Sequence, residues 1–315
     1  MKHWSFHKTL CKDTPTYKAN HEVVAAKKTL AEQELALGVD HLKTLSTVNR
    51  IGFLLREQGK LKEAELFFLR SLEGSERTLG RDHSETLAAV NNVGTLLQEQ
   101  GKLDLAEPYS RRSLDGYERT LGRDHTDTLG AANNMGMLLR AQGRLREAEL
   151  FLRRALEGYE WTLGRDHPDT LAAVGNVGML LRAQGKLSLA EPFYRRSLEG
   201  RERTLVCDHP DTLTSVNNMG VLMNDLGELD LAEQFFRRSL EGRERTLGRD
   251  HPDTLRAVNS MGSLLCDMGK FKKAEPFVRR ALEGRERILG SEHPDTRNSA
   301  AGLSMLLEEL ERRAK

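Results

Sequence analysis

The sequence has no excess of charge of either sign and no long apolar stretch. Its 48 lysine and arginine residues are balanced by 47 aspartate and glutamate residues, which leaves a formal net charge of +1. Proteins that bind nucleic acid or anionic membranes usually depend on a large basic excess, so we expect neither kind of partner. No apolar run reaches the roughly 18 residues of a transmembrane helix, and the N-terminus lacks the apolar core of a secretory signal.

Cysteine is scarce, and the motifs of common enzyme classes are missing. The three cysteines, Cys11, Cys207 and Cys266, are odd in number and lack the spacing of metal ligands. They argue against a disulfide framework and predict a reducing, cytoplasmic environment. The sequence has neither the GxxxxGK[ST] loop of nucleotide-binding proteins nor the GxSxG turn of serine hydrolases. We therefore expect a protein that is not an enzyme, with no catalytic residues, no cofactor and no metal.

Histidine recurs at a fixed interval along almost the whole chain. Seven of the ten histidines are spaced 42 residues apart, and each lies in a variant of the sequence DHPDTL. A constant period of about 20–50 residues is typical of stacked-repeat proteins. The chain therefore divides into six units, at residues 40–81, 82–123, 124–165, 166–207, 208–249 and 250–291, and the histidines are His41, His83, His125, His167, His209, His251 and His293.

Each unit is predicted to form two helices. In the second unit, apolar residues between positions 87 and 97 fall on one face of a first helix, which Gly101 ends. A second helix is expected over 103–121, where the favourable i,i+4 pair Glu107–Arg111 adds only about 0.2–0.5 kcal/mol. Corresponding pairs recur in the later units. They indicate an outer surface that carries many charged side chains but little net charge.

Two small residues recur without exception, a glycine on the first helix and an alanine on the second. Glycine inside a helix costs about 1 kcal/mol relative to alanine, so six copies indicate close contact between the two helices. The glycines are Gly52, Gly94, Gly136, Gly178, Gly220 and Gly262, and the alanines are Ala64, Ala106, Ala148, Ala190, Ala232 and Ala274.

Together these positions form a known signature. The series Val48, Ile51-Gly52, Leu55, Ala64 and Phe68 resembles the tetratricopeptide repeat (TPR) pattern W-x₂-L-G-x₂-Y followed by A-x₃-F. The 42-residue form with LG-x-DHPDT, a double Asn and QGK-x-x-x-AE is similar to the arrays of kinesin light chains. It is equally similar to the arrays attached to signalling ATPases of the NB-ARC type.

The resemblance covers residues 19–315 and implies the fold. We expect an all-α protein, a right-handed α-solenoid of stacked antiparallel helix pairs, that is, a TPR superhelix. Residues 19–39 are interpreted as a degenerate half repeat and residues 292–315 as a C-terminal capping helix. Residues 1–18 fit no repeat and are predicted to be a basic, disordered tail.

The most conspicuous repeated residues have a structural interpretation. One histidine per unit, without neighbouring ligands, is a poor metal site, whereas His-Pro-Asp suits the start of a helix. The paired arginines, such as Arg111-Arg112, could bind phosphate, but they follow a glutamate partner on the second helix. We interpret them as a solvated surface of ion pairs.

Function is expected on the inner surface, where first helices line the concave side of such arrays. Three rows of side chains would lie there. The first row is Asn49, Asn91, Asn133, Asn217 and Asn259; the second includes Met137 and Met179; the third includes Arg56, Arg140 and Arg182.

These rows suit an extended peptide. Asparagine can donate to and accept from a peptide backbone, methionine offers adaptable apolar contact, and arginine favours carboxylates. The resemblance to kinesin light chains implies the same use, because their grooves hold short acidic, aromatic-containing peptides. The alternative is that the asparagines only bridge neighbouring helices.

The sequence therefore predicts a non-catalytic scaffold that binds a protein or a short peptide in its concave groove. The peptide would be acidic and carry an aromatic or apolar anchor. The alternative function is a kinesin light chain-like cargo adaptor in microtubule-based transport. That role needs a segment that binds the motor heavy chain, and residues 1–39 lack sustained heptads.

Overall fold

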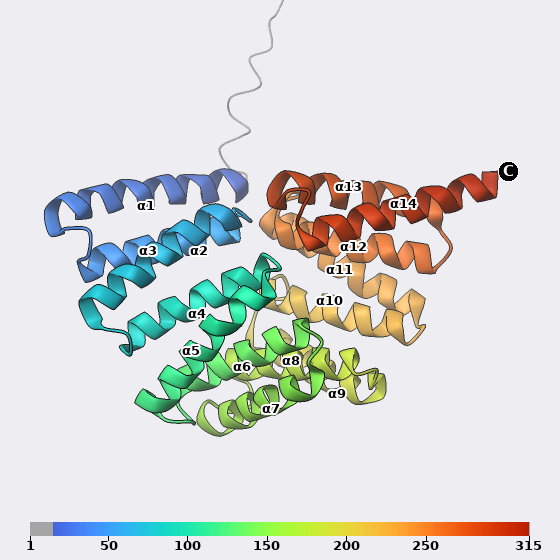
Figure 1. Cartoon of the computed structure of the whole chain (residues 1–315). Coiled ribbons are helices and arrows are strands. Elements are labelled where there is room, and N and C mark those ends of the chain that lie inside the picture. The colour runs from blue at the N-terminus through green and yellow to red at the C-terminus, as the bar shows by residue number, and fades with distance from the viewer. Residues whose placement is uncertain (1–14, 315) are drawn as a thin grey trace, which may run out of the picture.

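A computed structural model of the chain describes residues 15–314 and consists of α-helices joined by short turns. The helices pair in chain order, first with second, in each unit (Figure 1). They are α1 (Pro15–Leu37), α2 (Leu42–Glu57), α3 (Leu61–Leu79), α4 (Ser84–Glu99), α5 (Leu103–Leu121), α6 (Thr126–Ala141), α7 (Leu145–Thr162), α8 (Pro168–Ala183), α9 (Leu187–Thr204), α10 (Pro210–Asp225), α11 (Leu229–Leu247), α12 (Pro252–Asp267), α13 (Phe271–Leu289) and α14 (Pro294–Ala314).

This arrangement confirms the predicted fold class, an all-α solenoid of stacked helix pairs. The second helix expected over 103–121 coincides with α5. Of the tail predicted at residues 1–18, residues 15–18 are helical and belong to α1. Residues 1–14 lie outside the described residues.

The repeated histidine is a helix cap, as the sequence predicted. His167 precedes α8 with extended backbone, and its Nδ1 accepts a hydrogen bond from the Asp169 amide at 3.2 Å. The same bond forms at the start of α2, α4, α6, α10, α12 and α14. Because the first amides of a helix have no partner inside it, a side-chain acceptor stabilises the start.

The small residues bring the two helices of a unit into contact. A Cβ added at Gly136 would lie 2.6 Å from Leu152 Cγ and 3.2 Å from the Leu152 amide nitrogen, so a larger residue at this position of α6 would force Leu152 to shift. The alanines of the second helices, such as Ala148, are completely buried. The prediction of close helix contact at these positions is therefore confirmed.

Ion pairs hold the outer surface together in two ways. The first arginine of each pair bonds the glutamate one turn earlier, as Arg111 does with Glu107 at 2.7 Å. The second arginine reaches the preceding unit, as Arg112 does with Glu76 at 2.6 Å. These pairs are exposed or half-buried, and solvent-accessible ion pairs of this kind each contribute little to stability.

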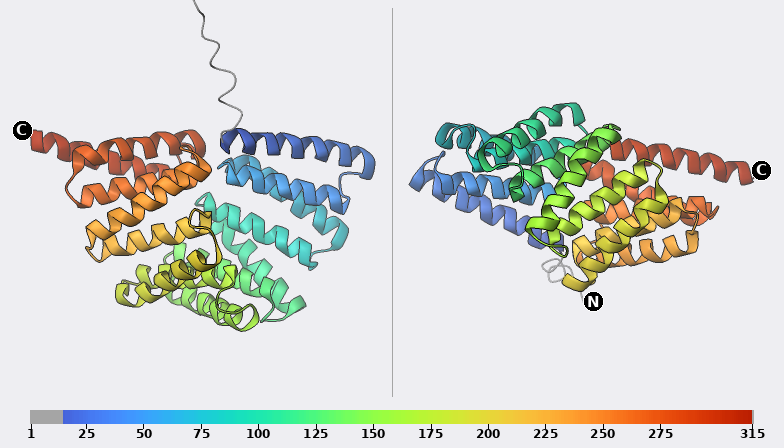
Figure 2. Two further views of the ribbon diagram at one scale, coloured as in Figure 1. Left: turned by 180° about the vertical axis from the view of Figure 1, so that it is seen from behind. Right: turned by 90° about the horizontal axis from the view of Figure 1, so that it is seen from below.

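Successive units turn steadily until the array meets itself. The first helices contact the first helices of the next unit, as α6 does with α8, which places them on the inside of the curve. The opposite views in Figures 1 and 2 both show the α1–α3 end beside the α12–α14 end, and α1 contacts α11. The solenoid thus completes one turn, and its ends lie side by side.

Candidate binding surface

The inner surface carries the three predicted rows on successive first helices. The asparagine row is engaged between units. Asn92 Nδ2 donates to Asn49 Oδ1 at 3.1 Å, and the same bond joins Asn134 to Asn91 at 3.1 Å and Asn176 to Asn133 at 2.9 Å. Each bond joins the second position of the Asn-Asn motif in one unit to the first position of the motif in the unit before. The hydrogen bonds therefore fit the bridging interpretation for these three carbonyls.

The row changes where the second asparagine is lost. Position 260, the counterpart of Asn176 two units later, is a serine whose hydroxyl bonds the Arg256 carbonyl. Asn217 Oδ1 is consequently buried without a partner. Asn259 accepts a bond from Ser299 Oγ at 3.3 Å. Ligand binding by the asparagine row stays a prediction, and Asn217 is the member with an unused acceptor.

The second row is apolar and half-buried. Met137 and Met179 pack against the core through part of their side chains and leave the rest accessible on the inner surface. Phe53 occupies the same position in the first unit, and the Arg56 guanidinium lies 5.3 Å from its ring centre. This row can contact an apolar ligand group.

The arginines of the third row pair with acidic residues one unit on, except for Arg140. Arg56 Nε lies 3.6 Å from Glu99 Oε2, and Arg182 Nε lies 2.5 Å from Asp225 Oδ2. Both partners are 43 residues further along the chain. The position 43 residues after Arg140 is Ala183, which carries no charge. Among the described residues, no side chain or carbonyl bonds the Arg140 guanidinium, and its Nε is buried without a partner.

Burial makes this unpaired cation unusual. Removal from water lowers the pKa of Arg140, and the nearby Arg182 acts in the same direction. Tyr194 lies close by, and burial raises its pKa to about 12. A desolvated guanidinium with free donors binds an anion more strongly than a hydrated one. Arg140 is therefore the strongest candidate for contact with a carboxylate.

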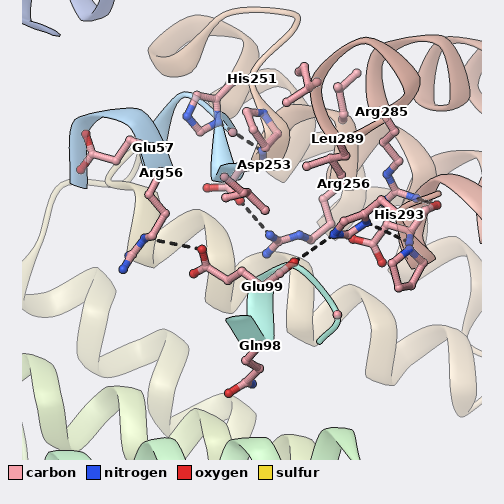
Figure 3. A pocket seen from close by; sticks show the side chains of 18 of the residues that line it. Arg56, Glu57, Gln98, Glu99, His251, Asp253, Arg256, Arg285, Leu289 and His293 are labelled. Carbon is pink, nitrogen blue, oxygen red and sulfur yellow. Dashed lines mark hydrogen bonds and ion pairs between the residues drawn. The ribbon is translucent and has the colours of Figure 1, made fainter. Parts of the chain in front are cut away.

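Arg140 also lines a cavity of 540 Å³. The cavity lies where the two ends of the array meet (Figure 3). One wall comes from the ends of α2 and α4, with Arg56 and Glu99. The other comes from the start of α12 and from α13, with Arg256 and Arg285. Arginine and acidic side chains line the cavity in equal numbers, so its overall charge does not favour an anion. The unpaired Arg140 is the feature that favours anion binding there.

Sequence reasoning missed an ionic link that recurs between units. Glu107, which follows the invariant alanine, accepts bonds from Gln142 at 3.1 Å and from Arg144 at 3.0 Å in the next turn. These bonds, with that of Arg111, lower the pKa of Glu107 to about 2. The signal was present in the QGK and AE motifs, which lie a constant distance apart.

A second missed feature distinguishes the two halves of the array. In the second and third units, Tyr117 and Tyr159 reach the carbonyls at the start of the first helix. From the fourth unit on, buried arginines take this position and bond the helix start of the following unit: Arg201, Arg243 and Arg285. These arginines are structural, because each donates to a carbonyl of the chain.

Two features, a metal-binding cluster and a membrane-spanning helix, are absent from residues 15–314. Nowhere in this range do three or more His, Cys, Asp or Glu side chains gather to hold a metal ion. No described helix is both long and apolar enough to span a membrane. Cys207 and Cys266 are free thiols.

Comparison with known families identifies the repeat. A model described as tetratricopeptide repeat matches residues 43–117, 85–160, 211–286 and 253–315, and a second model with the same description matches residues 170–211. No curated protein matches the sequence at a significant level.

Several crystal structures have the same fold. BtubC (BKLC) from P. vanneervenii is 24% identical with a TM-score of 0.55, over 74% of this chain and 94% of that one. A putative kinesin light chain of Podospora anserina with nearly identical TPR-like repeats is 18% identical with a TM-score of 0.50, over 65% and 97%. The apo form of RapI is 15% identical with a TM-score of 0.65, over 87% and 96%. At these identities the likeness concerns the fold alone.

Proposed function

Because the chain belongs to the tetratricopeptide repeat family, whose members generally bind other proteins, we propose that it binds an acidic peptide on its inner surface. The observation that supports this proposal is the unpaired Arg140. Every other arginine of its row pairs with an acidic residue one unit on, whereas Ala183 leaves the Arg140 donors free for a ligand. Met137, one turn before Arg140, offers an apolar contact beside that charge.

The bridged asparagines fit this function in a modified form. Their carbonyls are used between units, but each amide group of Asn49, Asn91 and Asn133 still has hydrogens to donate to a peptide carbonyl. We therefore expect the asparagine row to donate to the peptide backbone, with the specificity set by Arg140 and the methionines.

The experiment is a display screen on the full chain, followed by binding titrations of an enriched peptide at low and high salt. We expect peptides with acidic residues beside an aromatic one, bound more weakly as salt screens the charges. In Arg140→Gln, affinity should fall about tenfold, because a charge-assisted hydrogen bond contributes roughly 1.5–3 kcal/mol.

The control is Arg146→Gln, which removes the same charge from an exposed position of α7 outside the inner surface. Its affinity should stay within about twofold of the unmodified chain, because exposed charges at a distance are screened. Equal losses in Arg140→Gln and Arg146→Gln, or no enriched peptide at all, would contradict the proposal.

A role as cargo adaptor in microtubule-based transport is the narrower alternative. The fold likeness to a putative kinesin light chain and to BtubC (BKLC) is its support. No side chain on the inner surface distinguishes it from peptide binding in general, so it remains a special case of the function proposed above.

A further inference from the structure

The two ends of the array contact each other through a repeated set of residues, which we call the seam. A Cβ added at Gly59, in the turn after α2, would lie 2.9 Å from Pro252 Cγ at the start of α12. One unit on, a Cβ added at Gly101 would lie 2.6 Å from Pro294 Cγ at the start of α14. Two consecutive turns thus fit against two consecutive helix starts in the same register.

Two of the cap histidines, one unit apart, also contact the opposite side of the seam. His293 Nε2 lies 2.9 Å from the Glu99 carbonyl oxygen (Figure 3). Since His293 Nδ1 accepts from the Asp295 amide, Nε2 carries the proton and donates across the seam. One unit earlier, the His251 ring interacts with the backbone of Glu57, and burial lowers the pKa of His251.

Unit six departs from the repeat at the positions that reach this seam. The five other complete units have threonine where residue 288 is isoleucine. Those threonines, such as Thr246, bond a carbonyl of their own helix, whereas the Ile288 side chain lies against Gly59. Gly59 is buried there, although the other glycines at its position, such as Gly185, are exposed.

Residue 256 shows a second departure. The five other complete units have serine, alanine, glycine or threonine at this position, and unit six has Arg256. Its guanidinium pairs with Asp253 of the same helix at 3.1 Å and is directed toward Glu99 across the seam (Figure 3). Burial raises the pKa of the Glu99 carboxyl, and the charges of Arg56 and Arg256 oppose that rise. Both departures introduce a side chain that suits the surface opposite, one apolar and one of complementary charge.

We propose that unit six has diverged to dock onto units one and two of the same chain, so that the seam is an intramolecular interface that holds the array closed in solution. Arg256 and Ile288 both line the cavity at the seam, so the two changes fall on the same surface. The partner surface consists of the turn at Gly59, the turn at Gly101 and the carboxylate of Glu99. This inference does not depend on the proposed peptide binding.

A disulfide across the seam tests the proposal directly. Ile288 Cβ lies 3.9 Å from the position of a Cβ at residue 59, which is within the usual Cβ–Cβ range of a disulfide, about 3.5–4.5 Å. In full-length chain with Cys11, Cys207 and Cys266 changed to serine, Gly59→Cys with Ile288→Cys should oxidise to an intramolecular disulfide at micromolar protein concentration. The readouts are mobility in a non-reducing gel and intact mass.

The matched control is Gly185→Cys with Ile288→Cys. Gly185 has φ +74° and Gly59 has φ +75°, so the new cysteines meet the same backbone strain, but nothing lies within 4 Å of a Cβ at Gly185. This pair should not form an intramolecular disulfide. No disulfide in the Gly59 pair, or a disulfide only between two chains, would overturn the proposal; the second result would assign these surfaces to contacts between copies.

A second measurement does not require cysteines. Ile288→Glu places a charge in the seam, and Thr246→Glu places the same charge at the corresponding exposed position of unit five. By small-angle scattering we expect a larger radius of gyration for Ile288→Glu alone, with unchanged helical circular dichroism in both variants. Equal radii for both variants and the unmodified chain would contradict a closing role of Ile288.

Discussion

At the scale of the residue, one side chain in each unit decides where a helix begins. His167 provides an acceptor for the Asp169 amide, while Pro168 needs no partner for a missing N–H. Histidine is not among the usual N-cap residues, yet its Nδ1 reaches the same amide that an asparagine oxygen would reach. Each histidine of the 42-residue series therefore has a structural role as a helix cap.

We predict that His167→Ala destabilises the chain by about 1 kcal/mol, since one amide loses its acceptor at the start of α8. His167→Asn should recover most of that loss, because its side-chain oxygen can accept the same bond. Urea unfolding followed by circular dichroism measures both. If the alanine and asparagine variants unfold at the same urea concentration, the cap contributes nothing.

Sequence reasoning was successful where one residue acts within its own unit and incomplete where the partner lies in the next. The helix start at His167 and the close contact at Gly136 follow from local pattern. The pairing of Arg182 and the isolation of Arg140 depend on an offset of 43 residues, which is set by how one unit packs on another. Only the stacked structure shows that this offset brings the arginine of one unit to a carboxylate of the next, a partner that Ala183 cannot supply for Arg140.

At the scale of the element, the two helices of each unit can pack closely because a glycine of the first helix has no side chain. On α6, Gly136 allows the Leu152 side chain and backbone to approach, and similar contacts occur at Gly94, Gly178 and Gly262. The helix loses intrinsic stability at glycine but gains packing against its partner. The second helices have such a gap as well: a Cβ added at Gly116 on α5 would lie 2.3 Å from Leu87 Cδ2.

We expect Gly136→Ala to lower the free energy of unfolding by about 1–3 kcal/mol, because Leu152 must shift to admit the methyl group. Gly302→Ala is the contrasting change on α14, where nothing lies within 4 Å of the added Cβ. It should stabilise the chain by up to about 1 kcal/mol through helix propensity alone. Chemical denaturation of both variants measures the difference, and equal effects would exclude close contact as the reason for Gly136.

At the scale of the whole molecule, ionic links tie each unit to the next. Glu107 on α5 bonds Gln142 and Arg144, which belong to the following unit, and Glu149 repeats the link with Gln184. These bonds lower the pKa of Glu107 to about 2, from an ordinary value of 4.5. A depressed carboxylate pKa contributes stability above pH 4.5 that is lost as the pH falls toward 2.

We predict that Glu107→Gln is less stable than the unmodified chain at pH 6 and that the difference shrinks as the pH approaches 2. Asp115→Asn, an exposed change on the same helix without an ion pair, is the control and should differ little at either pH. Urea titrations at pH 6 and near pH 2.5 measure both variants. A difference for Glu107→Gln that stays constant with pH would show that the link is not ionic.

The seam has a consequence for how this gene can change length. Solenoids commonly gain or lose repeats by duplication or deletion, because each unit contacts only its neighbours. Here the bond from His293 to Glu99 joins residues 194 positions apart. One additional unit between them would present Thr246, not Ile288, to Gly59 and would carry Arg256 past Glu99. A closed seam therefore requires a fixed number of repeats, in addition to a particular sequence in each repeat.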